Sequence, residues 1–543
     1  MSNELDMSKA RVIEPEFDHR GTPIWRSVLS PPDDTFALVY VIPTRIIPVI
    51  VVPGVMGSNL KPKDKGESWR MDSKLTALSW ATKSAKQRKT FLRPEVMVVD
   101  DDGKVPTDMK LPAEELKRRG WGEIAAMSYG SALRWLEEHL NDFGSYQNGL
   151  RAQLRREALG AQVGEQLLSE DEVRLSYRYR FPVHAFGYNW LDDNAQSAQA
   201  LGRRIDEIIE RYNQREMSHG CPLARCEKVI LVTHSMGGLV ARYCSEVLGY
   251  RDKIYGIVHG VMPATGAAAV YRRMKAGTEG PWGVAQVLGA DAAEVTAVLS
   301  SAPGPLQLLP SPEYGNGWLR IRAGAQELAL PQQGDPYGEI YTVRGAWWGL
   351  CDEELINPLN EEKDPRMRRQ QVDRDWETYT KTILEVIAPF HQKIAAAYHP
   401  HTHAFCGASP EHKAYGTVSW QRSGDAGEPV QRWMQSPLAP RMGLREYSKT
   451  QGTRTVLHPR SRIPVTFTIS DPDEAGDGTV PARSGLAPQP HCQGFLRVPV
   501  EHEPAFNPDA GPASRQALLF TLRAIVRIAQ RVRESARMMY EDF

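Results

Sequence analysis

A serine near the middle of the chain stands where a strand is expected to turn sharply into a helix. Residues 229–232 are branched and apolar, as in a fully buried strand, and apolar residues recur at helical spacing from Leu239 onward. Only Thr-His-Ser-Met-Gly-Gly, residues 233–238, lies between them. So short a reversal pushes its middle side chain, that of Ser235, outward and requires small neighbours. The pattern predicts a serine nucleophile; the plainer alternative is a helix-capping serine.

A strand–serine–helix turn of this kind is the nucleophile elbow of α/β hydrolases. Thr233 replaces the first glycine of the usual Gly-x-Ser-x-Gly pattern. Because threonine is larger and β-branched, we expect either a small shift of the strand or a Thr233 side chain that points away from the turn. The predicted fold class is α/β: an α/β-hydrolase fold with a mainly parallel central sheet and large cap or lid insertions.

A serine hydroxyl needs a base and an orienting acid to attack an ester at neutral pH. In this fold the chain order is serine, acid, histidine. Asp477 lies between two glycines after the β-branched run 462–470, and it is the expected acid. His502 lies 25 residues later (502 − 477), after the expected last strand 494–500, and it is the expected base. Other acids on the same loop remain alternatives, namely Asp471, Asp473 and Glu474.

Two further histidines are set aside as the base. His234 is fixed next to the nucleophile and cannot turn back to it, and His491 precedes the last strand. The oxyanion of the reaction needs two backbone N–H donors. Met236, directly after the nucleophile, is expected to supply one. Met56 is expected to supply the other, from the Pro-Gly turn 53–60 that follows the apolar strand 45–52.

Four blocks occur in order along the chain, at residues 53–60, 186–190, 233–238 and 476–481, followed by His502. Together they resemble the lecithin:cholesterol acyltransferase family of lipases and acyltransferases. Residues 186–190, Phe-Gly-Tyr-Asn-Trp, are similar to a Tyr-Asp-Trp-Arg segment of that family, with Leu191 in place of the arginine. Residues 306–310 resemble a leucine–proline stretch near its lid.

Within that family, the chain looks most like the bacterial branch that includes type VI secretion lipase effectors. This resemblance implies phospholipase A activity against the membrane of a rival cell. It also implies a cognate immunity protein that blocks the site and a secretion-spike protein as partners, with an accessory chaperone as an open alternative. The substrate would then be a lipid in a membrane.

Length and charge are those of an enzyme with insertions. The 543 residues exceed a single hydrolase domain of roughly 250–300 residues. With 66 basic and 66 acidic residues the net charge is +0, so nucleic acid is not an expected partner. The cysteines are too scattered for a disulfide framework or a zinc site, and free thiols are expected, although the first two could pair after export: Cys221, Cys226, Cys244, Cys351, Cys406 and Cys492.

Targeting signals are not evident in the sequence. The first eleven residues lack the basic region and apolar core of a signal peptide. The longest apolar stretch, residues 36–55, is interrupted by prolines and an arginine and is expected to form two short strands. We therefore expect a protein made in the cytoplasm without a Sec signal. It would act there or leave by a signal-independent machine, with the periplasm of a target cell as the destination of an effector.

The expected organisation is an irregular leader, residues 1–35, followed by one α/β-hydrolase domain over residues 36–543. Insertions are expected at about 61–185, 260–330 and 345–460, and amphipathic helices at 194–213 and 514–531. The segment 260–330 follows the strand beside the nucleophile strand and is the candidate lid or cap. A plain helical insertion packed on the core is the alternative.

Flexible and aromatic apolar side chains in the candidate lid would suit an acyl chain: Met262, Val270, Tyr271, Met274, Trp282 and Val284. Three basic residues nearby could contact lipid phosphates or simply form a solvated helix face, namely Arg272, Arg273 and Lys275.

No cofactor is expected, and a structural calcium ion remains an open alternative because some lipases carry one. His399, His401 and His403 would share one face of a strand, as metal ligands could, but Pro400 favours a polar loop that enters the next strand. The acidic run 100–102 lacks the spacing of a calcium loop and is expected to form a surface turn.

Three functions follow from these observations. The first is a serine lipase or phospholipase that hydrolyses acyl esters of glycerophospholipids through an acyl-enzyme. The second is an acyltransferase or a housekeeping esterase on the same site, which the sequence cannot separate because the acyl-enzyme is shared. The third is a non-catalytic binding protein of the same fold. An intact serine, aspartate and histidine set argues against the third.

Overall fold

The computed structural model describes residues 9–19, 21–26, 36–39, 42–143, 148–159, 166–214, 225–279, 287–422, 424, 427–439 and 452–540. At its centre is a six-stranded sheet in the order β19–β13–β10–β9–β5–β8, with every neighbouring pair parallel. Its strands are β5 (Val49–Val52), β8 (Val183–Ala185), β9 (Val229–His234), β10 (Ile254–Gly260), β13 (Thr402–Gly407) and β19 (Cys492–Val498).

Helices cover both faces of this sheet, which explains why β5, β9 and β10 are apolar and buried along their whole length. On β10, a Cβ at Gly256 would contact Ile528 of α17 (Pro512–Ala529). His259 on the same strand instead faces Gly238 of α8 (Gly237–Arg242). Because side chains alternate along a strand, α17 and α8 lie on opposite faces. The long amphipathic helix α7 (Asn194–Asn213) packs beside α8.

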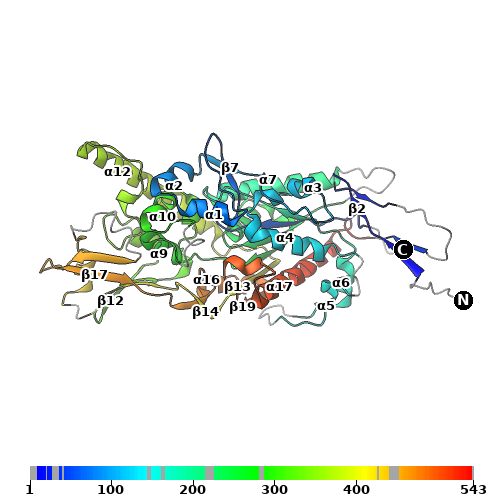
Figure 1. Cartoon of the computed structure of the whole chain (residues 1–543). Coiled ribbons are helices and arrows are strands. Elements are labelled where there is room, and N and C mark those ends of the chain that lie inside the picture. Colours follow the sequence, from blue (N-terminus) through cyan, green and yellow to red (C-terminus); the bar gives the residue numbers. More distant parts are fainter. Residues whose placement is uncertain are drawn as a thin grey trace.

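The segment between β5 and β8 consists mostly of short elements, which are spread along the molecule rather than gathered in one place (Figure 1). It contains the hairpin of β6 (Leu60–Pro62) and β7 (Met97–Val99). Its helices are α1 (Lys74–Ala81), α2 (Ala85–Phe91), α3 (Ala113–Arg118), α4 (Ala126–Leu140), α5 (Leu150–Gln153) and α6 (Glu170–Ser176). Of these, α4 contacts both β8 and the 3-10 turn η10 (Glu503–Phe506), so it lies beside the end of the central sheet.

A second, five-stranded sheet projects at the left end of Figure 1, in the order β12–β11–β15–β17–β16. Its strands are β11 (Leu319–Ala323), β12 (Gln326–Leu330), β15 (Val418–Arg422), β16 (Thr453–Leu457) and β17 (Pro464–Ile469). The expected insertion over 345–460 needs correction, because β13 inside it belongs to the central sheet. The rest of that range adds α12 (Pro365–Lys381), α13 (Ala388–Ile394), α14 (Val430–Met434) and β14 (Ser409–Ala414).

The candidate lid, residues 260–330, contains α9 (Ala269–Ala276), α10 (Ala292–Leu299) and α11 (Pro303–Leu306) and then enters the second sheet. Four of its six apolar residues singled out above are buried: Met262, Val270, Tyr271 and Met274. The other two, Trp282 and Val284, lie outside the described residues.

The basic residues of this segment were expected either to contact lipid phosphates or to form a solvated helix face, and neither expectation describes them well. Lys275 is buried and paired with Asp352 at 2.9 Å, because an ammonium group removed from water requires a counter-charge. Arg272 and Arg273 are mostly covered and both pair with Glu279, at 3.2 and 2.9 Å. Their charges are therefore directed into the protein rather than toward a lipid surface.

The leader is more regular than expected in its described part. Residues 9–26 include β1 (Ala10–Ile13), β2 (Glu16–Phe17) and β3 (Pro23–Ile24). β1 pairs in parallel with β4 (Phe36–Val39), so β4 belongs to a two-stranded sheet rather than to the hydrolase core.

Two further observations concern helices and thiols. Among the described residues, none of the helices combines the length and apolar character needed to cross a membrane. Cys226, Cys244, Cys351, Cys406 and Cys492 are buried free thiols, while Cys221 lies outside the described part of the chain.

Candidate active site

Ser235 sits on a strained turn at the end of β9. Its φ of +53° lies in the left-handed region that residues with a Cβ rarely adopt. The Ser235 N–H donates to the Gly260 carbonyl at 3.0 Å, which ties the turn to the end of β10. A Cβ at Gly237 would lie 2.5 Å from the Val52 and Pro53 carbonyl oxygens. A glycine at this position is therefore a steric requirement of the turn.

Thr233, which replaces the usual first glycine, points away from the turn. Its hydroxyl lies 2.8 Å from Nδ1 of His259 on β10, and both residues are fully buried. Burial lowers the pKa of His259 to about 3, so this histidine is neutral and can share a hydrogen bond with a hydroxyl. The threonine is thus accommodated by a hydrogen bond across the sheet.

The structure brings Ser235, His502 and Asp477 into one hydrogen-bonded chain. Nε2 of His502 lies 2.9 Å from Oγ of Ser235, and Nδ1 of His502 lies 2.9 Å from Oδ2 of Asp477. Ser235 is only 3% exposed and Asp477 2%, whereas the His502 side chain is 15% exposed. In this arrangement the imidazole can accept the serine proton while the carboxylate holds its other nitrogen protonated.

Asp477 is held in place by its own turn. Its Oδ1 accepts hydrogen bonds from the Thr479 and Val480 N–H groups at 2.9 and 2.7 Å, which leaves Oδ2 for His502. The residue follows β18 (Glu474–Gly476), and a Cβ on Gly407 would lie 2.4 Å from the Asp477 Cβ. The acid therefore lies against the end of β13, although 70 residues separate Gly407 from Asp477 (477 − 407).

The alternative acids make other contacts. Asp473 accepts hydrogen bonds from the Gly416 and Thr417 N–H groups, both at 2.9 Å. Glu474 pairs with Arg483 at 2.6 Å, and Asp471 is exposed. The strand expected before the acid, β17, is present but lies in the second sheet. Its place before the acid in the sequence was therefore a misleading guide to the geometry.

The two expected oxyanion donors, Met236 and Met56, follow the ends of β9 and β5, respectively. Met236 occupies the N-terminal end of α8, where N–H groups have no partner within the helix. Met56 has a φ of +65°, a second strained non-glycine residue at the site. In its turn, Gly54 N–H donates to the Tyr129 hydroxyl and Gly57 N–H to the Gly54 carbonyl. Among the described residues, no backbone carbonyl outside a helix or strand accepts a hydrogen bond from the N–H of Met56 or of Met236.

Gly54 packs directly on the nucleophile, which gives a testable prediction. A Cβ at Gly54 would lie 2.8 Å from the Ser235 Cβ and 3.1 Å from His234 Nδ1. We expect Gly54→Ala to lower esterase activity by at least about 10-fold, because displacing reacting groups by a fraction of an ångström is costly. The measurement is initial rate on a p-nitrophenyl ester. Gly130→Ala is the matched control, since the nearest atom to its Cβ lies 4.0 Å away.

Full activity in Gly54→Ala would contradict this close packing. Gly130 lies inside helix α4, where replacing glycine by alanine is expected to stabilise the protein by about 0.5–1 kcal/mol. A loss of activity in both variants would instead indicate a general effect of the substitution on folding, which thermal unfolding would reveal.

Two residues of the site were missed in the sequence. His234 was set aside as a base, but its Nε2 lies 2.8 Å from the His502 carbonyl and its Nδ1 2.7 Å from the Tyr129 hydroxyl. Tyr129 comes from α4, for which the sequence carried no catalytic signal. Burial, and then the charge of His502, lower the pKa of His234 to about 3. The imidazole of His234 is therefore neutral.

Residues 186–190, one of the blocks on which the family resemblance rests, form hydrogen bonds with the turn of residues 53–60. Tyr188 donates its hydroxyl proton to the Pro53 carbonyl at 2.8 Å, and its N–H donates to Ser58 Oγ at 3.0 Å. Leu191, in place of the arginine of the related segment, is fully buried. Apolar burial at this position explains why a charge is not needed there.

Metal candidates can be judged from their contacts. His403 is buried in β13, while His399 and His401 precede that strand and accept hydrogen bonds from His401 N–H and Gln493, respectively. Among the described residues, the only group of three or more side chains placed to share an ion is Asp100–Asp102.

The acidic run differs from its sequence expectation in one respect. Asp100 is fully buried rather than part of a surface turn, and it pairs with Arg70 at 2.5 Å and with Lys61 at 3.8 Å. Asp101 also pairs with Lys61, at 2.8 Å. Arg70 and Lys61 therefore pair with two of the three carboxylates of this group, those of Asp100 and Asp101.

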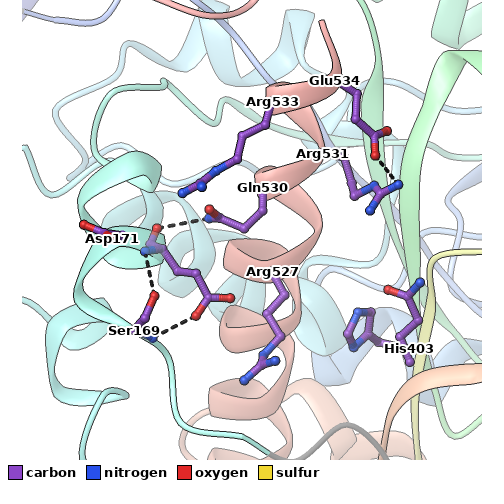
Figure 2. A pocket seen from close by; sticks show the side chains of 10 residues that line it. Ser169, Asp171, His403, Arg527, Gln530, Arg531, Arg533 and Glu534 are labelled. Carbon is purple, nitrogen blue, oxygen red and sulfur yellow. Dashed lines mark hydrogen bonds and ion pairs between the residues drawn. The ribbon is translucent and has the colours of Figure 1, made fainter. Parts of the chain in front are cut away.

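A cavity of about 620 Å³ (Figure 2) has neither Ser235 nor His502 among its lining residues. His403 and Gln493 mark its position at the amino ends of β13 and β19, whereas Ser235 and His502 follow the carboxyl ends of their strands. Ligands of α/β sheets bind at the carboxyl ends. Three arginines and three carboxylates line the cavity, so their charges balance: Arg527, Arg531, Arg533, Asp171, Glu172 and Glu534.

The parallel sheet, its covering helices and the turn at Ser235 define an α/β-hydrolase fold. No protein-family model matches the sequence, and no curated protein matches it. Among solved structures, the chain is similar to a chain in the crystal structure of the Tle4–Tli4 complex, with a TM-score of 0.72 and 28% sequence identity. The similarity covers 90% of this chain and 99% of the other.

Proposed function

We propose that this protein is a serine hydrolase that cleaves acyl esters of glycerophospholipids through an acyl-enzyme. The single observation that carries the proposal is the continuous hydrogen-bonded chain from Ser235 Oγ through His502 to Asp477, at 2.9 Å for each link. It combines a nucleophile on a strained turn, a base within reach and an acid that fixes the base.

In the proposed reaction, Ser235 Oγ attacks the ester carbonyl while His502 Nε2 takes its proton. The N–H groups of Met56 and Met236 stabilise the negative charge that develops on the carbonyl oxygen. His502 then gives its proton to the leaving alcohol, and the acyl group remains on Ser235. Water, deprotonated by the same imidazole, attacks the acyl-enzyme; the bond between the acyl carbon and Ser235 Oγ breaks, His502 returns the proton to that oxygen, and a fatty acid is released. Asp477 stabilises the imidazolium form of His502 in both steps.

A lipid substrate is supported by three observations. The ordered blocks resemble lipases and acyltransferases, and the fold is similar to that of a chain of the Tle4–Tli4 complex. Ser235 is 3% exposed, so the nucleophile is largely covered from water in this conformation. Such covering is expected of an enzyme that hides an apolar acyl site from water until it meets a lipid surface.

We further propose that the protein acts as an antibacterial type VI secretion effector. The resemblance to bacterial lipase effectors supports this role, and so does the structural similarity to a chain of a two-protein complex, Tle4–Tli4. An effector of this kind requires an immunity protein in the producing cell and a spike protein that carries it out. Its working place would be the periplasm of the target cell.

Activity on dispersed long-chain phospholipid is expected to exceed activity on a short soluble ester. Exposing an apolar acyl site of several hundred Å² in water costs free energy, whereas a lipid surface compensates for that exposure. The measurement is the initial rate against phospholipid concentration across its critical micelle concentration, beside a short-chain p-nitrophenyl ester. We expect a steep increase above the micelle threshold.

The control for this assay is Ser235→Ala, whose rate is subtracted at each lipid concentration. Hyperbolic kinetics with a preference for the short ester would instead identify an open-pocket esterase, and the lipid proposal would be wrong. Adding a long-chain alcohol to the same assay separates the acyltransferase alternative, since transfer yields a new ester instead of free fatty acid.

A further inference from the structure

The main chain of His502 is fixed on both sides by the residues around it. Its N–H donates to the Asp477 carbonyl at 2.9 Å, and its carbonyl accepts a hydrogen bond from Nε2 of His234 at 2.8 Å. One bond ties the base to the acid's own residue, and the other ties it to the residue directly before Ser235. The spacing of the three proposed catalytic groups is thus set by main-chain contacts as well as by their side chains.

A buried chain of hydrogen bonds continues from His234 to the Pro-Gly turn of residues 53–60, called the oxyanion turn below. Nδ1 of His234 lies 2.7 Å from the Tyr129 hydroxyl, and that hydroxyl lies 3.0 Å from the Gly54 N–H. The Tyr129 oxygen accepts from the Gly54 N–H, and because the His502 carbonyl can only accept, Nδ1 of the neutral His234 ring is left to accept the Tyr129 hydroxyl proton. His234 then carries its own proton on Nε2, which is the tautomer that donates to the His502 carbonyl.

The environment keeps this direction of hydrogen bonding fixed. Tyr129 and His234 are 4% and 6% exposed, and their rings meet edge to face with centroids 5.6 Å apart. Burial raises the pKa of Tyr129 and lowers that of His234 to about 3. Both side chains are therefore neutral at any pH at which a histidine base functions, and neither bond is lost by titration.

Helix α4 also contacts the segment that follows the base. Ser128 Oγ donates to the Glu503 carboxylate at 3.0 Å, and Ser131 Oγ lies 3.4 Å from Asn507 Oδ1. The first turn of α4 therefore touches the oxyanion turn through Tyr129 and the His502 loop through Ser128. This contact is a structural reason for the segment between β5 and β8 to lie beside the site.

We propose that Tyr129 and His234 are positioning residues, which hold the His502 main chain and the oxyanion turn in register with Ser235 through one directed chain of hydrogen bonds. The inference rests on the proposed function, because it assigns to these two residues the alignment of that same triad. The hydrogen bonds of these side chains go to the His502 carbonyl, to the Gly54 N–H and to each other, and the His234 ring packs beside the His502 ring with centroids 5.3 Å apart. Their removal should therefore slow the chemical step and leave substrate binding unchanged.

The experiment measures how fast a fluorophosphonate probe labels Ser235, together with kcat and KM on a p-nitrophenyl ester. Tyr129→Phe keeps the ring and removes the hydroxyl, and His234→Leu removes both ring nitrogens. We expect each to lower kcat and the labelling rate by about 10- to 100-fold, because small displacements of a base cost this much. KM should change by less than about 2-fold, as expected for loss of transition-state alignment alone.

A conservative variant separates positioning from general packing. His234→Gln places an amide donor near the position of Nε2, and it should recover a large part of the rate that His234→Leu loses. Tyr212 and His184 form a matched control. They are an equally buried tyrosine–histidine pair, and the Tyr212 hydroxyl lies 2.9 Å from Nε2 of His184. Neither residue belongs to the site around the serine. Tyr212→Phe should leave the labelling rate within about 2-fold of the wild type.

Each outcome decides a different question. If the wild-type protein is not labelled at Ser235, the proposed function is wrong and this inference with it. If the wild type is labelled and Tyr129→Phe and His234→Leu react at the wild-type rate, only the positioning role is overturned. Equal losses in Tyr129→Phe and Tyr212→Phe would show a general effect of removing a buried hydroxyl, which also overturns it.

Discussion

Replacing Ser235 by alanine is expected to reduce ester hydrolysis on the order of 10⁴- to 10⁶-fold, the loss that follows removal of a triad nucleophile. The hydroxyl oxygen of Ser235 is the atom that carries the acyl group in the acyl-enzyme. Its proton is the one that Nε2 of His502 accepts, across a distance of 2.9 Å between the two heavy atoms. The measurements are turnover of a p-nitrophenyl ester and labelling by a fluorophosphonate, which should mark the wild type and not the variant.

Folding should be nearly unchanged in this variant. Only one oxygen is removed, and alanine carries the same Cβ into the left-handed conformation that serine adopts there. Thermal unfolding and circular dichroism provide the control. Labelling that persists in Ser235→Ala would show that another residue is the nucleophile, and the site assignment would be wrong.

Asp477→Asn and His502→Ala are each expected to lose on the order of 10⁴-fold in kcat, and the double variant should be little worse than either single one. The reason is that both residues act through one proton transfer, so that transfer can be lost only once. Asparagine at 477 would also offer its amide to Nδ1 of His502, which favours the wrong imidazole tautomer.

The matched controls are the neighbouring acids, Asp473→Asn and Asp471→Asn. Asp473 accepts hydrogen bonds from two backbone N–H groups elsewhere, at 2.9 Å each, so its replacement is expected to lower stability and to leave kcat within a few fold. Near-normal turnover in Asp477→Asn, with loss in one of these two, would move the acid to that position.

The sequence was sufficient to single out residues that lie together in the structure. The local rule behind Ser235 is steric: a strand that becomes a helix within six residues needs glycines around an outward side chain. That rule acts within a short segment and can be read directly. Asp477 and His502 were found from chain order and from their place after expected strands, and the structure places Asp477 and Ser235 within hydrogen-bonding distance of the His502 imidazole.

The arrangement of the strands around these residues could be predicted less well from the sequence. β13 was hidden in an expected insertion, and β17 was expected to lead to the acid but lies in the second sheet. A short strand carries little information about its neighbours, because pairing is decided by contacts between segments distant in sequence. The apolar pattern of a strand indicates burial but not the sheet in which it is buried.

By itself the sequence determined the strained serine turn, the order of the reactive groups and the kind of chemistry they can do, since these depend on residue types over short distances. Only the tertiary structure decided which acid reaches His502, because Asp477 is set by its contact with Gly407 on β13. It also decided that His234, rejected as a base, contacts the base, and that Tyr129 joins it from α4. These contacts join residues that are 105 and 268 positions apart in the sequence, and the pattern of residue types along the chain does not show which distant residues meet.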